Sequence, residues 1–203
     1  MTSSTRSLLV LLREGTEANH QRLEEHPLLR PLMASTLSLE QYSRVIAAFA
    51  GFYAALERGI QELSSGIDFP GYHYEPRLPL LLDDLAALPV CTVVPCTVAP
   101  EYSNENELVG MLYVLEGATQ GGRVIAPRVQ QHLALSETSG ARYFNFYRQD
   151  SWREFRAMVE KRQEHYDCHR ARDAACATFD NLYSHLEHCL SNSGDLFSER
   201  HDQ

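Results

Sequence analysis

The sequence lacks an apolar run long enough to cross a membrane, which takes about 18 consecutive apolar residues. The run nearest the start, Leu8 to Leu12, covers five residues and ends before Arg13. No cleavage-like site of small residues follows it, as it would in a secretory leader. We therefore expect a soluble cytoplasmic protein with no membrane partner.

Basic residues are too few to form a nucleic-acid surface. The chain has 18 Lys and Arg against 27 Asp and Glu, a net charge of -9. Binding phosphates requires a basic face, so this balance argues against nucleic acid and against anionic membranes as partners. A small or locally recognised partner is expected instead.

Cysteines are also few, and their spacing is irregular. Five occur in 203 residues, without a C-x-x-C pair, in a chain long enough to fold without disulfides. An odd number at such spacings predicts free thiols in a reducing compartment, at Cys91, Cys96, Cys168, Cys176 and Cys189.

Apolar residues recur at helical spacing along most of the chain. Residues 89–100 are rich in Val and Thr, but three prolines exclude them from a β-ladder and predict an irregular connection. With 44% apolar residues the chain can bury one core, so we expect a single all-α domain over residues 1–203. The helices are expected over about residues 5–25, 38–65, 78–88, 104–133, from 150 onward, and 170–190.

Three glycines interrupt a helical pattern at YVLEGATQGGRVI, residues 113–125. Each helix-interior glycine costs about 1 kcal/mol relative to alanine, so Gly117, Gly121 and Gly122 together cost about 3 kcal/mol. A G-x-x-x-G-G set clears side chains from one helix face. Either a neighbouring helix or a flat ligand can then lie against the backbone, and the spacing leaves both alternatives open.

The nine histidines are the candidate metal ligands. His20 differs from the others because it stands beside the apolar stripe of the first helix, three residues before Leu23. It is either a core histidine with hydrogen-bond partners or a ligand, and Glu24, one turn later, could accept its second N–H. Solvated faces are expected for the C-terminal histidines, His165, His169, His185, His188 and His201.

Two motifs together, LREGTEANHQRLE (12–24) and EGATQGGRVI (116–125), resemble the haem oxygenases, particularly the bacterial biliverdin-producing branch that serves phytochromes. The resemblance continues through FNFYRQDSWREF and ACATFDNLY and covers most of the chain. It implies a haem oxygenase-like helical bundle with haem between the first helix and the glycine helix. His20 would be the axial iron ligand. Gly117 and Gly121 would approach the iron from the other side, and Gly122 would give the helix room to bend.

The resemblance also implies a reaction. Haem would be both cofactor and substrate, and dioxygen would cleave it to biliverdin, carbon monoxide and ferrous iron. Electrons would come from an external donor, a ferredoxin or a reductase, since no G-x-G-x-x-G fingerprint follows a strand. A bacterial phytochrome would receive the biliverdin.

The sequence departs from the family pattern beside the first glycine. Many members have an aspartate there, which holds the water chain that delivers protons, but this chain has Ala118. An alanine side chain offers water no hydrogen bond. Glu116, Gln120 or Arg123, or waters on backbone carbonyls, are expected to organise the network instead.

Two arginines match basic positions that hold the haem propionates in the family, Arg13 on the first helix and Arg156 in the WREF helix. A second basic position on that later helix is Glu160 here, with Lys161 beside it. Bidentate arginine contacts suit carboxylates at a pocket edge, although a solvated surface charge is the plain alternative.

Two other functions stay open on the sequence alone. One is a non-enzymatic haem carrier or sensor that uses the same pocket, which the missing aspartate allows. The other is a related all-helical enzyme acting on another small molecule, such as the thiamin-degrading type. A carrier or sensor would bind added haem without breaking it down, whereas a haem oxygenase would degrade it. Failure to bind haem at all would favour the enzyme that acts on another small molecule.

Overall fold

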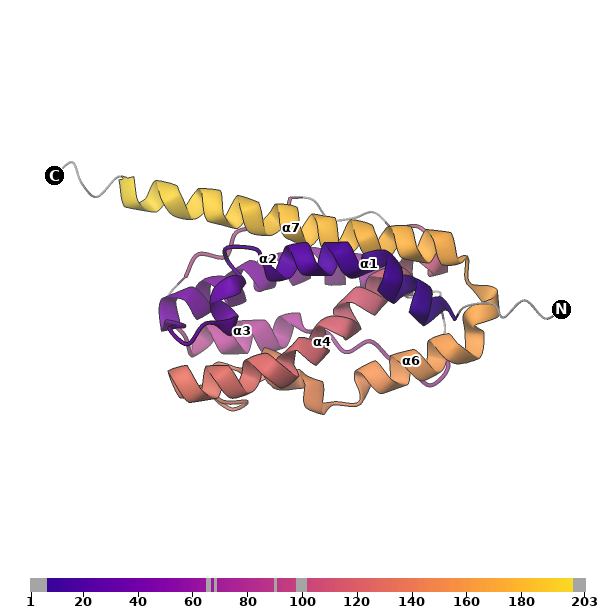
Figure 1. The fold of residues 1–203 in the computed structure, drawn as a ribbon, viewed down its shortest axis with the longest axis horizontal. Coiled ribbons are helices and arrows are strands. Elements are labelled where there is room, and N and C mark those ends of the chain that lie inside the picture. The colour runs from indigo at the N-terminus through magenta and orange to yellow at the C-terminus, as the bar shows by residue number, and fades with distance from the viewer. Residues whose placement is uncertain (1–6, 65–66, 68, 90, 98–101, 199–203) are drawn as a thin grey trace.

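The chain folds into an elongated bundle of α-helices (Figure 1). The computed structural model describes residues 7–64, 67, 69–89, 91–97 and 102–198. The only β-pairing among these residues is a pair of isolated bridges at Ser136, so the expected all-α class is confirmed. The helices are α1 (Leu8–Glu24), α2 (Leu39–Ser64), α3 (Leu78–Ala86), α4 (Glu105–Leu133), α5 (Arg142–Asn145), α6 (Ser151–Arg162) and α7 (Cys168–Ser198), with short 3-10 turns at Arg30–Met33, Phe146–Arg148 and Gln163–His165.

Side-chain caps explain where the long helices begin. The backbone N–H of Ser38 donates to Gln41 Oε1 at 2.9 Å and that of Gln41 to Ser38 Oγ at 3.2 Å, which is the predicted capping box of α2. Asn104 Oδ1 accepts from the N–H groups of Asn106 and Glu107, at 3.0 and 3.2 Å, as expected for the start of α4.

The helices pack around α4, which contacts α7, α5 and α6. α1 lies along α7 at one edge of the bundle, and α4 runs obliquely below them in Figure 1. The α4 residues Leu108, Met111 and Leu112 are fully buried and form part of the hydrophobic core. α1 and α4 each pack mainly on α7.

Several sequence expectations need correction. α7 begins at Cys168 and reaches Ser198, beyond the expected 170–190, and α5 with the turn after it was not anticipated. His185 was expected on a solvated face but is buried, because α7 also packs on α2; its Nε2 lies 2.9 Å from the Ala48 carbonyl oxygen. His201 lies outside the described residues.

Other expectations are confirmed. Residues 91–97 form no helix or strand, and residue 90 and residues 98–100 of that connection lie outside the described part. All five cysteines are free thiols. Within the described ranges, every helix is too short or too polar to cross a bilayer.

Candidate functional site

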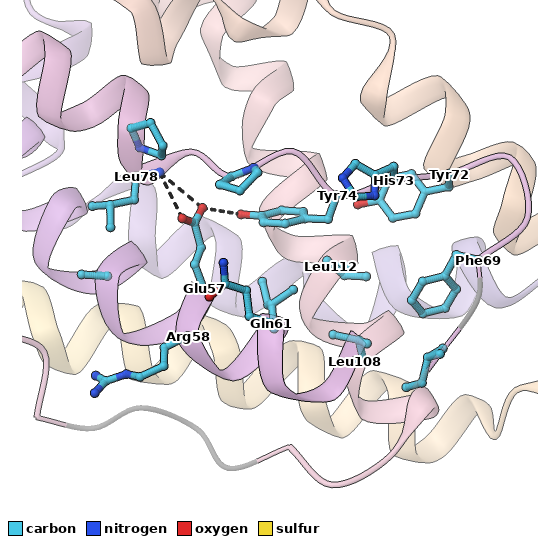
Figure 2. A pocket seen from close by; sticks show the side chains of 15 residues that line it. Glu57, Arg58, Gln61, Phe69, Tyr72, His73, Tyr74, Leu78, Leu108 and Leu112 are labelled. Carbon is cyan, nitrogen blue, oxygen red and sulfur yellow. Dashed lines mark hydrogen bonds between the residues drawn. The ribbon is translucent and has the colours of Figure 1, made fainter. Parts of the chain in front are cut away.

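Among the cavities lined by described residues, two have the size of small-molecule pockets, about 300 to 1,000 Å³. The larger, about 590 Å³, lies between α2, residues 67–79 and the first half of α4 (Figure 2). Its carboxylate, Glu57, is already bonded, since it accepts from Tyr74 Oη at 2.8 Å and from the N–H of Leu78 at 3.2 Å. No predicted site residue lines this cavity.

The second cavity, about 440 Å³, is lined by α1, α2, α4, α5 and α7 together with the turn after α1. Its lining is mostly aliphatic and aromatic. The polar side chains in it are His20, Glu24, Tyr53 and Tyr143. Because this cavity joins His20 to Ala118 and Gly121 of the glycine helix, it is the candidate site.

His20 reaches the cavity through helical periodicity. It continues the row formed by Leu8, Leu12 and Thr16, all buried, and residues four apart lie on one helix face. At His20 that face leaves the core, and 60% of the imidazole surface is exposed. Nδ1 lies 3.6 Å from Glu24 Oε1. Within the described residues Nε2 has no hydrogen-bond partner, so it is available to a ligand.

The glycines divide into two kinds. A Cβ on Gly117 would find its nearest neighbour, Trp152 Cζ3, at 4.0 Å, and one on Gly121 would find Ile125 Cδ1 at 3.8 Å. Neither glycine is therefore required by packing within the chain. A Cβ on Gly122 would lie 2.2 Å from the carbonyl oxygen of Phe144, so only glycine allows α5 to approach α4 there.

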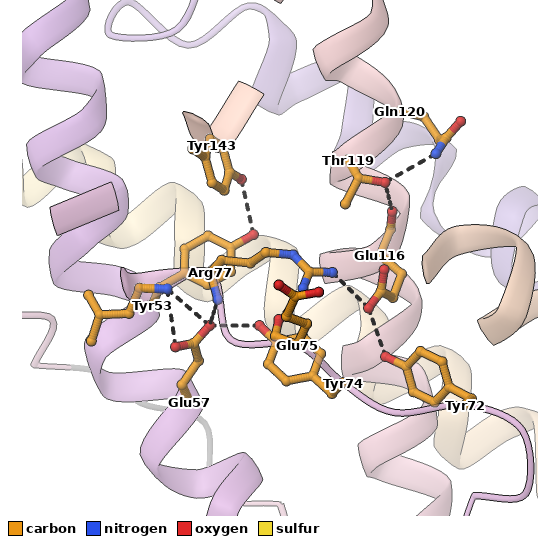
Figure 3. Close-up of polar contacts among 11 residues, drawn as sticks. Tyr53, Glu57, Tyr72, Tyr74, Glu75, Arg77, Glu116, Thr119, Gln120 and Tyr143 are labelled. Carbon is orange, nitrogen blue, oxygen red and sulfur yellow. Dashed lines mark hydrogen bonds and ion pairs between the residues drawn. The ribbon is translucent and has the colours of Figure 1, made fainter. Parts of the chain in front are cut away.

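The α4 side chains expected to replace the missing aspartate do not line the cavity. Glu116 is fully buried, and its Oε1 receives hydrogen bonds from Arg77 Nη2 and Tyr72 Oη, both at 2.8 Å (Figure 3). Arg123 Nε donates to Gln120 Oε1 at 2.9 Å, and neither residue borders the cavity.

Two tyrosines that sequence reasoning did not single out meet in the cavity instead. The hydroxyls of Tyr53, from α2, and Tyr143, from α5, are 3.0 Å apart (Figure 3). Burial raises the pKa of Tyr143 to about 12 and that of Tyr53 well above its ordinary value, so both keep their protons near neutral pH. In the sequence Tyr53 is one more member of an apolar stripe.

A buried arginine lies near these two tyrosines. Arg77 is fully buried, pairs with Glu116, and lies with its guanidinium carbon 3.8 Å from the ring centroid of Phe146. Its positive charge opposes the effect of burial on the pKa of Tyr53 and Tyr143. No periodic pattern marks Arg77, because it comes from the turn-rich stretch before α3.

The two expected propionate ligands, Arg13 and Arg156, are exposed and do not border the cavity. Arg156 Nη2 lies 3.4 Å from Glu160 Oε1, so part of its charge is already paired. α6 nevertheless comes close to the glycine face, since Trp152, one turn before Arg156, is the nearest neighbour of Gly117.

Comparisons with known proteins identify the family of the chain. The family model described as Heme oxygenase matches residues 6–187. A protein named Heme oxygenase from Xanthomonas campestris pv. campestris (strain 8004) is 30% identical over 168 residues, which covers 81% of this chain and 97% of that protein.

Two solved structures share the fold. The heme oxygenase from Leptospira interrogans has a TM-score of 0.66 at 20% identity, and the match covers 89% of this chain and 98% of the other. Heme oxygenase-1 from the cyanobacterium Synechocystis sp. PCC6803, solved in complex with heme, has a TM-score of 0.66 at 16% identity, with 95% and 98% covered. Together with the family match, these likenesses show that the chain belongs to the haem oxygenase family of enzymes.

Proposed function

We propose that the chain cleaves haem to biliverdin, carbon monoxide and ferrous iron, and that haem binds in the 440 Å³ cavity between α1 and α4. The observation that carries the proposal is that His20 and Gly121 line the same cavity. One offers an imidazole and the other an uncovered stretch of helix backbone. A flat, largely apolar molecule with a central metal ion fits between such surfaces.

His20 would hold the haem iron through Nε2. Neutral imidazole is the commonest protein ligand of this kind, and its other nitrogen usually faces a carboxylate or carbonyl that fixes the ring. Glu24 Oε1, 3.6 Å from Nδ1, supports this role for Glu24. The remaining exposure of His20 also agrees with a side chain that needs a ligand to cover it.

The opposite face of the haem would lie against Ala118 and Gly121. Haem, when bound and reduced, supplies the iron that activates dioxygen. The chain's own contribution on this side is space, because at Gly117 and Gly121 no neighbouring atom comes closer than 3.8 Å to where a Cβ would stand. Aliphatic side chains such as Val124 and Ile125 complete this side of the cavity.

Arg13 and Arg156 would bind the two propionates at the cavity edge, where carboxylates remain in contact with water. Arg156 would then exchange its contact with Glu160 for one with a propionate. The proposal includes an external electron donor, a ferredoxin or a reductase, and a bacterial phytochrome as the receiver of biliverdin. Both partners follow from the sequence resemblance.

A reaction with ascorbate tests the activity. Purified protein is mixed with ferric haem, ascorbate and air, and the absorption spectrum is followed. Loss of the Soret band with growth of the red absorption of biliverdin is expected. A Soret band that persists would instead favour a haem carrier and overturn the proposed cleavage.

A haem titration tests the site. His20→Ala is expected to lose the spectrum of a histidine-ligated haem and to weaken binding at least about tenfold, since it removes the iron ligand. The matched control is His169→Ala, which removes an exposed imidazole at the start of α7 and should bind as the wild type does. Equal binding and equal spectra for the two variants would contradict the assignment of His20.

A further inference from the structure

The glycine helix offers no polar side chain to a ligand in the cavity. Its lining residues are all aliphatic or glycine: Val114, Leu115, Ala118, Gly121, Val124 and Ile125. Glu116 is held by Arg77 and Tyr72 away from the cavity. A side chain that donates a hydrogen bond on this side of the haem must therefore come from a different element.

Only two of the polar side chains in the cavity remain as candidates for this hydrogen-bond donor. His20 and Glu24 both belong to α1, where the proposed function uses them to hold the iron. Tyr53 comes from α2 and Tyr143 from α5, the helix packed on α4 at Gly122. These tyrosines are the only other hydrogen-bonding side chains among the described residues that line the cavity.

We propose that the Tyr53–Tyr143 hydroxyl pair supplies the hydrogen-bond donor on the face of the haem opposite to His20, in place of the side chain that Ala118 lacks. This inference rests on the proposed function. The hydroxyls are 3.0 Å apart, so one donates to the other. Each hydroxyl carries a single proton, and the pair therefore keeps one O–H to direct into the cavity.

The surroundings keep that O–H protonated and make it a good donor. Burial holds both hydroxyls in the neutral form, while the nearby charge of Arg77 acts in the opposite direction and makes the O–H groups more acidic. Arg77 and Tyr143 lie near each other beside Ala118, where they border the same small gap in the packing. Arg77 Nε is buried there and has no hydrogen-bond partner within the described residues.

The ferric haem complex provides a measurement that is independent of turnover. A water on the open side of ferric haem loses a proton as the pH rises, and the absorption spectrum changes. A donor to that oxygen favours the hydroxide, so it lowers the midpoint of the transition. The double variant Tyr53→Phe/Tyr143→Phe is expected to raise the midpoint by about one pH unit, because hydrogen bonds to charged groups are worth about that much.

Tyr42→Phe is the matched control. Tyr42 is also a buried tyrosine of α2, but its hydroxyl donates to the carbonyl oxygen of Gly140 at 2.9 Å and does not line the cavity. This variant loses a buried hydrogen bond without changing the haem environment. It should keep the wild-type midpoint even if its unfolding temperature falls.

The outcomes separate this inference from the proposed function. The single variants Tyr53→Phe and Tyr143→Phe are titrated as well, and at least one is expected to reproduce most of the shift; they decide the question if the double variant does not fold. Normal haem binding with every midpoint within about 0.2 pH units of Tyr42→Phe would overturn the inference alone. A wild-type complex without any such transition would overturn it too. Failure of the proposed function is detected by a separate result: the His20→Ala variant would bind haem as the wild type does.

Discussion

The carboxylate of Asp84, on α3, accepts the backbone N–H groups of Arg142 at 2.7 Å and Tyr143 at 2.9 Å. It thereby satisfies the free N–H groups at the start of α5, a helix of only four residues. The ring of Tyr143 and that of Phe144 line the cavity. A residue outside the cavity thus fixes two of the side chains inside it.

Replacing Asp84 should therefore affect both stability and haem binding. Asp84→Ala leaves one buried and one partly buried N–H group without acceptors and is expected to lower the free energy of unfolding by about 2 kcal/mol. Asp83→Ala is the matched control, because Asp83 is exposed and meets Arg142 only through its side chain, at 3.2 Å; we expect a loss under about 1 kcal/mol. Urea unfolding measures the stability of both variants, and haem titration should show weaker binding for Asp84→Ala only. Equal losses of stability and of haem affinity in the two variants would contradict this prediction.

The glycines of α4 should respond oppositely to alanine. Gly121→Ala is expected to stabilise the haem-free protein by up to about 1 kcal/mol, since it removes a helix-interior glycine where a Cβ has room. Haem binding or cleavage should weaken, because the added methyl group enters the cavity.

Gly122→Ala is the comparison within the same motif. Its Cβ would collide with the carbonyl oxygen of Phe144, so the unfolding temperature should fall. Thermal unfolding without haem measures both variants. Gly121→Ala destabilising the chain as much as Gly122→Ala would show that protein packing, and not a ligand, explains Gly121.

The buried pair of Arg77 and Glu116 should contribute far more than an exposed pair of the same kind. Arg77→Met leaves the Glu116 carboxylate buried without its cation, which costs about 3 to 5 kcal/mol. Arg156→Met removes the exposed contact with Glu160 and should cost about 1 kcal/mol or less. Equilibrium unfolding in urea measures the stability of both variants. Similar urea midpoints for Arg77→Met and Arg156→Met would contradict this prediction.

Stability should fall below neutral pH because of two buried histidines. Burial lowers the pKa of His26 and His185 below 6.5, so in mildly acid solution the unfolded chain binds more protons than the folded one. Their contribution is present above pH 6.5 and is lost as the pH falls through the lowered values.

His26→Asn tests this pH dependence. Nδ1 of His26 accepts the N–H of Leu28 at 3.1 Å, and its Nε2 lies 2.9 Å from Glu187 Oε1; asparagine can retain an acceptor for Leu28. The variant should lose less stability than the wild type between pH 7 and 5.5, at most about 1.4 kcal/mol less per pH unit. The exposed His169→Asn should keep the wild-type slope. If the free energy of unfolding of His26→Asn depended on pH as strongly as that of the wild type, His26 would not be a source of the pH dependence.

The sequence by itself determined most of the long helices and the helix face that carries His20. Local periodicity and caps place α1 and α4, and the row through Leu12, Thr16 and His20 follows from 3.6 residues per turn. The glycine spacing was also readable, although it could not separate Gly121, which faces the cavity, from Gly122, which contacts α5.

Only the tertiary structure decided what stands opposite His20. Tyr53, Arg77 and Tyr143 come from three separate segments. The two hydroxyls meet because α2 and α5 both pack on α4, and the charge of Arg77 acts on both. Side chains brought together across 90 residues leave no periodic trace, since periodicity reports the neighbours along one helix and not the partners across a core.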